Sequence, residues 1–92
     1  MVTIVKPTYA GRVKVAVIFE AGNMRPVWFV PDTSRSAADR IMVGRVNQVW
    51  NSSEGITRVI HFAVSAAGND YILTFNTNDF TWTAYVSEES GF

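Results

Sequence analysis

The chain has no cysteine and only one histidine, His61, among its 92 residues. The lack of cysteine excludes disulfide bonds, cysteine–zinc sites and a cysteine nucleophile, so packing alone must hold the fold. Metal motifs that need two histidines are excluded as well. No Gly-rich phosphate loop or nucleophile elbow occurs. We therefore expect a protein that is not an enzyme and that binds no metal or cofactor.

Charged residues are also scarce. They make up 17% of the chain, whereas 48% of the residues are hydrophobic and 13% aromatic. This composition opposes intrinsic disorder and predicts a single domain over residues 1–86 with a thin core, followed by a polar tail at residues 87–92 that frays. With so few charges, some apolar side chains must lie at the surface or beneath a partner.

Long apolar runs are missing too. No stretch approaches the ~18 residues of a membrane span, and Met1–Ala10 lacks the apolar region of a signal peptide. We therefore expect no membrane partner, and a cytoplasmic location fits these patterns.

The charges that are present are unevenly distributed. Residues 1–45 hold seven basic and three acidic side chains, and residues 46–92 hold one basic and five acidic ones, so the halves carry +4 and −4. Such an asymmetry is typical of an anion-binding face or a self-complementary surface. Chance distribution along the chain explains it equally well.

Strand patterns, in contrast, are abundant. Residues 13–19 and 27–30 are rich in β-branched and aromatic side chains on either side of Gly22-Asn23, and residues 59–65, 71–75 and 80–86 repeat the pattern around Gly68-Asn69 and Asn78-Asp79. The registers that these turns impose predict one buried face in the second half. That face comprises Phe62, Val64, Tyr71, Leu73, Phe75, Phe80, Trp82, Ala84 and Val86.

Residues 34–50 fit two patterns. A stripe of apolar positions and a sequence resembling a capping box at Ser36–Asp39 favour a helix, whereas Gly44 and its β-branched neighbours favour a strand. We predict a strand over Ile41–Trp50, preceded by at most one helical turn and carrying a bulge near Gly44. The bulge would bring Val46 and Trp50 to the inner face.

Short strands with tight turns between them define an all-β fold. We predict a small antiparallel meander that closes into a partly open SH3-like or OB-like barrel. Val2–Val5 is a further short strand in this prediction. Asn51–Gly55, which contains a glycosylation-type Asn-Ser-Ser, is interpreted as a turn.

The first hairpin provides the candidate interaction surface. A two-residue loop at Gly22-Asn23 would pair Glu20 with Arg25 and place apolar side chains beside cations on the face that water should cover. Pro26 cannot donate to a ladder, so this hairpin lies at a sheet edge or carries a bulge. The candidate surface consists of Arg12, Lys14, Ile18, Arg25, Val27 and Phe29.

An apolar strip bordered by charges is typical of interaction sites. The rest of the chain could cover it, as could a second copy in a weak homodimer or another protein. The main hypothesis is a non-enzymatic binding or assembly module that self-associates through this strip. The alternative is a nucleic-acid-binding barrel, in which Phe29 stacks on a base and Arg12, Lys14 and Arg25 contact phosphates.

A second and weaker candidate is a polar cluster on the outer face of the second half. The predicted register places His61 across from Asn76 and near Thr74. A catalytic domain around His61 is the third functional hypothesis, and a solvated strand face is the simpler explanation.

Overall fold

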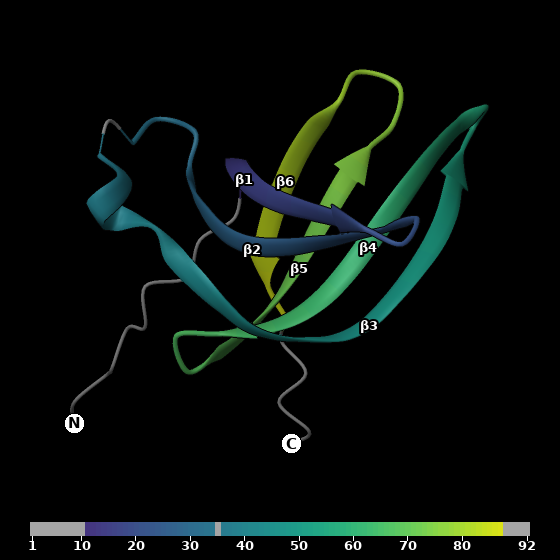
Figure 1. Ribbon diagram of the computed structural model, residues 1–92. Coiled ribbons are helices and arrows are strands. Elements are labelled where there is room, and N and C mark those ends of the chain that lie inside the picture. Colours follow the sequence, from purple (N-terminus) through teal and green to yellow (C-terminus); the bar gives the residue numbers. More distant parts are fainter. Residues whose placement is uncertain (1–10, 35, 88–92) are drawn as a thin grey trace, which may run out of the picture.

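The structure is a computed structural model, and it describes residues 11–34 and 36–87. Its elements in chain order are β1 (Gly11–Glu20), β2 (Asn23–Pro31), the 3-10 turn η1 (Ala37–Asp39), β3 (Ile41–Glu54), β4 (Thr57–Ala66), β5 (Asn69–Asn76) and β6 (Thr81–Val86). Consecutive strands pair antiparallel and β1 pairs with β6, which closes the sheet into a barrel (Figure 1). The all-β barrel with at most one helical turn is confirmed. Its likeness to SH3-like or OB-like barrels stays a prediction, and the strand expected at Val2–Val5 and the tail beyond Ser87 lie outside the described residues.

The barrel closes over only part of its length. β2 and β3 share two residue pairs, and β1 and β6 share three. Beyond these short contacts the β1–β2 hairpin continues as a two-stranded ribbon, and β3 sweeps away from β2 alongside β4 (Figure 1). As a result, β3 has a long edge that no described strand covers.

Two hairpins use the same loop. Ala21-Gly22 and Ala67-Gly68 each have φ near 51° and 79°, the two positive values of a type I′ turn. Both loops begin one residue earlier than predicted, so the register is shifted by two residues and Ala66 lies opposite Asn69. A shift of two keeps every side chain on its face, which is why the predicted faces survive near these turns.

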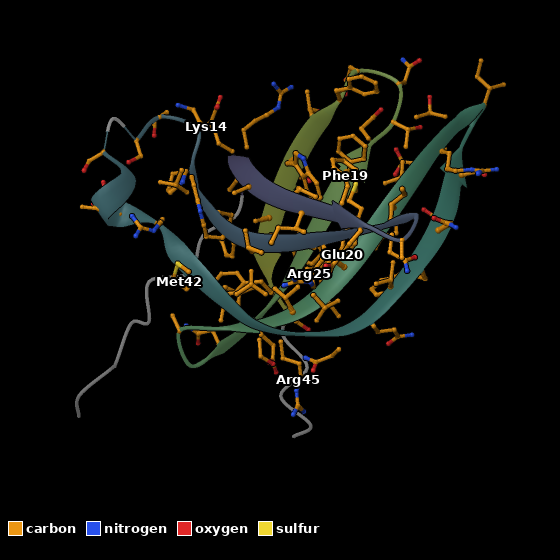
Figure 2. All side chains as sticks on the ribbon, viewed as in Figure 1. Lys14, Phe19, Glu20, Arg25, Met42 and Arg45 are labelled. Atoms are coloured by element: carbon orange, nitrogen blue, oxygen red, sulfur yellow. The ribbon has the colours of Figure 1, made fainter. Side chains whose placement is uncertain are left out.

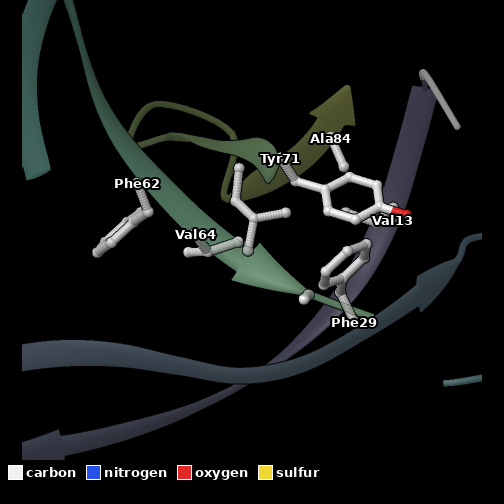
Figure 3. Packing of buried hydrophobic residues seen from close by; sticks show 8 residues of the cluster. Val13, Phe29, Phe62, Val64, Tyr71 and Ala84 are labelled. Atoms are coloured by element: carbon white, nitrogen blue, oxygen red, sulfur yellow. The ribbon is translucent and has the colours of Figure 1, made fainter. Parts of the chain in front are cut away.

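The inner face of β4, β5 and β6 forms much of the core (Figure 3). Leu73 lies opposite Ala84 and Phe75 opposite Trp82, in the register that the sequence predicts. The ring centroid of Trp82 is 4.8 Å from that of Phe75 and 5.6 Å from that of Phe62. Of the predicted face, Phe62, Val64, Tyr71, Leu73 and Ala84 are buried, and Phe75, Trp82 and Val86 are partly buried.

The prediction was wrong for Phe80, whose exposed fraction is 75%. The loop between β5 and β6 spans four residues, and Phe80 ends it with a φ of 60°. The strand therefore begins at Thr81, and the Phe80 ring stacks against Phe75 at 5.9 Å instead of entering the core.

The strand predicted over Ile41–Trp50 is confirmed, as is its bulge at Gly44. A second register shift, at Asn47, was not predicted. Each extra residue reverses the inward and outward alternation. Val46 packs against the core as expected, but Trp50 lies opposite His61 on the outer face, so its predicted inward position was wrong.

The predicted turn at Asn51–Gly55 was also wrong. β3 continues through Ser52 and Ser53 to Glu54, and the hairpin turns at Gly55-Ile56, where Gly55 has a φ of 66°. A glycine with positive φ in the first loop position suits a two-residue hairpin. The longer hairpin brings Ser52 close to His61, which is central to the polar cluster described below.

Candidate functional site

The outer surface of β1, β2 and the start of β3 holds most of the described cations and several apolar side chains. Cross-strand pairing places Ala16, Trp28 and Met42 in one row, with the Ile18–Arg25 and Lys14–Val30 pairs on either side of it. Figure 2 shows Lys14, Arg25 and Met42 on this part of the barrel. We call Arg12, Lys14, Ile18, Arg25, Trp28, Arg40 and Met42 the basic face.

The prediction that Phe29 belongs to this surface was wrong. A bulge in β2 sets Val17 opposite Pro26 and Ala16 opposite Trp28, which leaves Val27 as the extra residue. The bulge turns Phe29 inward, where it is 0% exposed and packs edge-on against Tyr71 with ring centroids 5.0 Å apart. Trp28 takes its place on the outside. Pro26 was the signal in the sequence, because proline within a sheet is confined to edges and bulges.

The remaining residues of the predicted surface lie outside the core. Arg12, Lys14, Ile18 and Arg25 are exposed, and Val27 is half-buried. Arg25 and Glu20 form an ion pair at 3.4 Å, as the sequence predicts, although the two are diagonal neighbours since Arg25 lies opposite Ile18. Both side chains are at least half exposed, so the pair contributes little to stability.

Trp28 is the aromatic centre of the basic face, and sequence reasoning missed it. The guanidinium carbon of Arg40 lies 6.0 Å from the centroid of the Trp28 ring, at the limit of a cation–π contact. Apolar side chains remain open beside this pair, since Ile18 is 40% and Met42 is 55% exposed. The face can therefore offer both positive charge and apolar contact area to a partner.

The outer surface of β3, β4 and β5 has a different chemistry. His61 on β4 bridges two hydroxyls: its Nε2 is 2.8 Å from Ser52 Oγ on β3, and its Nδ1 is 3.1 Å from Thr74 Oγ1 on β5. The Trp50 indole stacks on the imidazole with a centroid distance of 5.1 Å. The structure thus brings His61 and Thr74 together as the sequence predicts. It adds Ser52, which was missed because the strand was expected to end at Trp50, and Trp50 itself, which was expected to face the core.

Asn76 does not join this cluster. Its side-chain oxygen accepts hydrogen bonds from the backbone N–H groups of Asn78 and Asp79, so it stabilises the loop between β5 and β6. His61 lies opposite Thr74 instead, because the β4–β5 register is shifted by two residues from the predicted one. Asn76 lines a hollow of about 220 Å³ that Thr74 also borders, and Trp50 lines another of about 250 Å³.

Ser52 and His61 have the contact that a nucleophile and its base require. The third member is the neutral hydroxyl of Thr74, however, where a carboxylate would stabilise a protonated imidazole. The arrangement favours a polar network that fixes the register of three strands over a catalytic triad. Among the described residues no group of three or more metal-ligating side chains is clustered, and no described helix is long and apolar enough to cross a membrane.

Comparison with protein-family models, curated proteins and solved structures finds no match to this chain.

His61→Ala should lower the free energy of unfolding by roughly 1–2 kcal/mol, because two hydrogen bonds between half-buried groups are lost. Urea unfolding followed by circular dichroism measures the change. Thr83→Ala, an exposed substitution on β6, is the control and should leave the midpoint unchanged. A His61→Ala midpoint equal to that of the parent would show that the network does not hold the strands together.

Proposed function

We propose that this chain is a non-enzymatic, cytoplasmic binding module that engages a protein partner through its basic face. The supporting observation is the exposure of Ile18 and Met42 on the same surface as Lys14, Arg25 and Arg40. An exposed apolar patch with a charged border is typical of protein interaction sites. The partner that fits is a protein segment that combines apolar side chains with carboxylates.

The charge balance favours a protein over a polyanion. The chain has no net charge, and Asp70 on β5 and Asp79 in the loop between β5 and β6 lie outside the basic face. A long nucleic acid would approach these carboxylates as well as the cations, whereas a short acidic segment can stay on the basic face. Apolar contacts from Ile18 and Met42 also contribute to protein binding more than to phosphate binding.

Nucleic acid remains the second candidate, and Trp28 is the observation that favours it. An indole beside Arg40 and close to Lys14 is the combination that stacks on a base and contacts its phosphates. In this case Trp28, not Phe29, would be the stacking residue. Binding would then weaken steeply as salt is raised, because bound counterions are released from the nucleic acid.

A peptide library displayed on phage tests the proposal with a defined probe. Selection on the immobilised chain should enrich sequences that contain acidic residues next to leucine or aromatic residues. Synthetic peptides of these sequences should bind Arg25→Glu and Met42→Glu variants at least about tenfold more weakly than the parent, since one change adds repulsion and the other removes apolar contact.

Arg58→Glu is the matched control, because Arg58 is an exposed cation on β4, outside the basic face. It should leave peptide affinity nearly unchanged. Peptides that bind Arg25→Glu as tightly as the parent would contradict the proposal, as would a selection without enrichment. Binding of single-stranded DNA or RNA decamers that falls steeply with salt and is lost in Trp28→Ser would favour the nucleic-acid candidate instead.

Self-association through the strip on the first hairpin is now less well supported. With Phe29 in the core, Trp28 takes its place on that strip, but Trp28 and Val27 are both partly buried and Ile18 is the exposed apolar side chain that remains. This is little area for a dimer. A different part of the barrel is better suited to contact between copies.

A further inference from the structure

The free edge of β3 is the longest unpaired strand edge among the described residues. β3 pairs with β2 only at Ile41 and Met42, and with β4 from Val43 to Glu54. Its other side therefore presents backbone N–H and C=O groups along residues 43–54, where Figure 1 shows the strand running clear of β2. Such an edge is a template for pairing with another strand.

The side chains of β3 alternate regularly once the two bulges are taken into account. Val46 and Val49 lie opposite Val64 and Phe62 and face the core side. Between Arg45 and Glu54, the outer side of β3 carries five residues, each with a partner on β4: Arg45 opposite Ser65, Gln48 opposite Ala63, Trp50 opposite His61, Ser52 opposite Val59 and Glu54 opposite Thr57. The bulge at Asn47 is what places Arg45 and Glu54 on the same face although an odd number of positions separates them.

This order of outer residues is self-complementary. If a second copy of β3 runs antiparallel with Trp50 on the two-fold axis, Arg45 of each copy lies opposite Glu54 of the other. Gln48 then lies opposite Ser52, which pairs polar side chains, and on the inner side Val49 lies opposite Asn51. Opposite charges in facing positions stabilise an antiparallel pair, and the two-fold symmetry provides the contact twice.

We propose that two copies of this chain pair along β3, with Trp50 at the centre and reciprocal Arg45–Glu54 contacts at the ends. The centre has apolar surface to bury, since Val49 is 52% and Trp50 is 36% exposed, on opposite sides of the strand. Figure 2 shows Arg45 projecting away from the barrel, where a second copy can reach it. The pairing uses residues 45–54 of β3 and shares no residue with the basic face, so it is separate from the proposed partner site.

Charge reversal tests the pairing. Sedimentation equilibrium on the parent should show a dimer at concentrations of up to a few hundred micromolar. Glu54→Arg and Arg45→Glu should each raise the dissociation constant at least about tenfold, because both end contacts then join like charges. The double variant Arg45→Glu with Glu54→Arg restores opposite charges and should return the dissociation constant to within about threefold of the parent value.

Circular dichroism on every variant checks that the fold is retained, which is expected because Arg45 and Glu54 are exposed. A parent that stays monomeric at several hundred micromolar would overturn the proposal. A dimer whose dissociation constant is unchanged by both single reversals would also overturn it. So would a double variant whose dissociation constant stays raised, because the two charges would then not face each other. Each of these results leaves peptide binding at the basic face to be judged by its own experiment.

Amide hydrogen exchange locates the contact independently. Exchange in residues 48–54 should slow as the protein concentration rises through the dissociation constant, while exchange at the tip of the β1–β2 hairpin stays the same. Slowing at that hairpin with no change in β3 would place the interface on the first hairpin and overturn the proposed pairing.

Discussion

Phe29→Ala should lower the free energy of unfolding by about 3–5 kcal/mol, the usual effect of removing a buried phenylalanine ring. The side chain is 0% exposed and its ring lies 5.0 Å from that of Tyr71, so its removal leaves a cavity and also breaks an edge-on aromatic contact. A domain of this size has roughly 5–10 kcal/mol of stability in total. The variant should therefore be largely unfolded or marginally stable at room temperature.

Phe19→Ala is the matched control, because Phe19 belongs to the same hairpin but is 75% exposed. Thermal and urea unfolding followed by circular dichroism should show a parent-like transition for Phe19→Ala and a loss of most of the transition for Phe29→Ala. If the two variants behaved alike, Phe29 would not be in the core. The first hairpin would then have no bulge at Val27, and Phe29 would lie on its outer strip.

Trp82→Ala should have the second-largest effect, a loss of roughly 3–4 kcal/mol. Its ring lies against both Phe62 and Phe75, and contacts between aromatic rings add to the energy of burying the apolar surface. The change would also leave Phe75 without the ring that faces it across β5 and β6. Unfolding in urea, followed by the circular dichroism of the strands, measures the loss.

Trp50→Ala is the control for Trp82→Ala, since both remove an indole from a strand but Trp50 lies on the outer face and is 36% exposed. Trp50→Ala should lower the free energy of unfolding clearly less than Trp82→Ala does, because the aromatic contact that it removes is the stacking on His61. Equal losses for the two variants would mean that Trp82 does not pack against the core.

The sequence could predict much of the fold, because the signals for strands and turns are local. The Ala-Gly-Asn segments mark two hairpins, and the one-residue error in each loop shifted the register by an even number, which leaves the faces intact. The face of β4, β5 and β6 was therefore predicted nearly completely. Phe80 was the exception. It ends the loop between β5 and β6 with a φ of 60°, and no residue pattern predicts that backbone conformation.

The candidate sites were harder to predict, because bulges decide them. One extra residue at Val27 exchanges Phe29 for Trp28 on the basic face, and one at Asn47 moves Trp50 from the core side to His61. Gly44 gave a signal for its bulge in the sequence, and Pro26 gave one for the bulge beside it. Asn47 gave none, since its role is a hydrogen bond to Ser65 on the neighbouring strand.

By itself, the sequence determined that the chain forms a cysteine-free all-β domain, that hairpins turn within one residue of Gly22 and Gly68, and that its cations are concentrated in the first half. These properties follow from composition and from neighbours within a few residues. Only the tertiary structure decided which side of each bulged strand faces the core, how far β3 runs beyond Trp50, and that one edge of β3 stays unpaired. A bulge or a free edge depends on hydrogen bonds between strands that are distant in the chain, and the energy of such a ladder is set by both strands together.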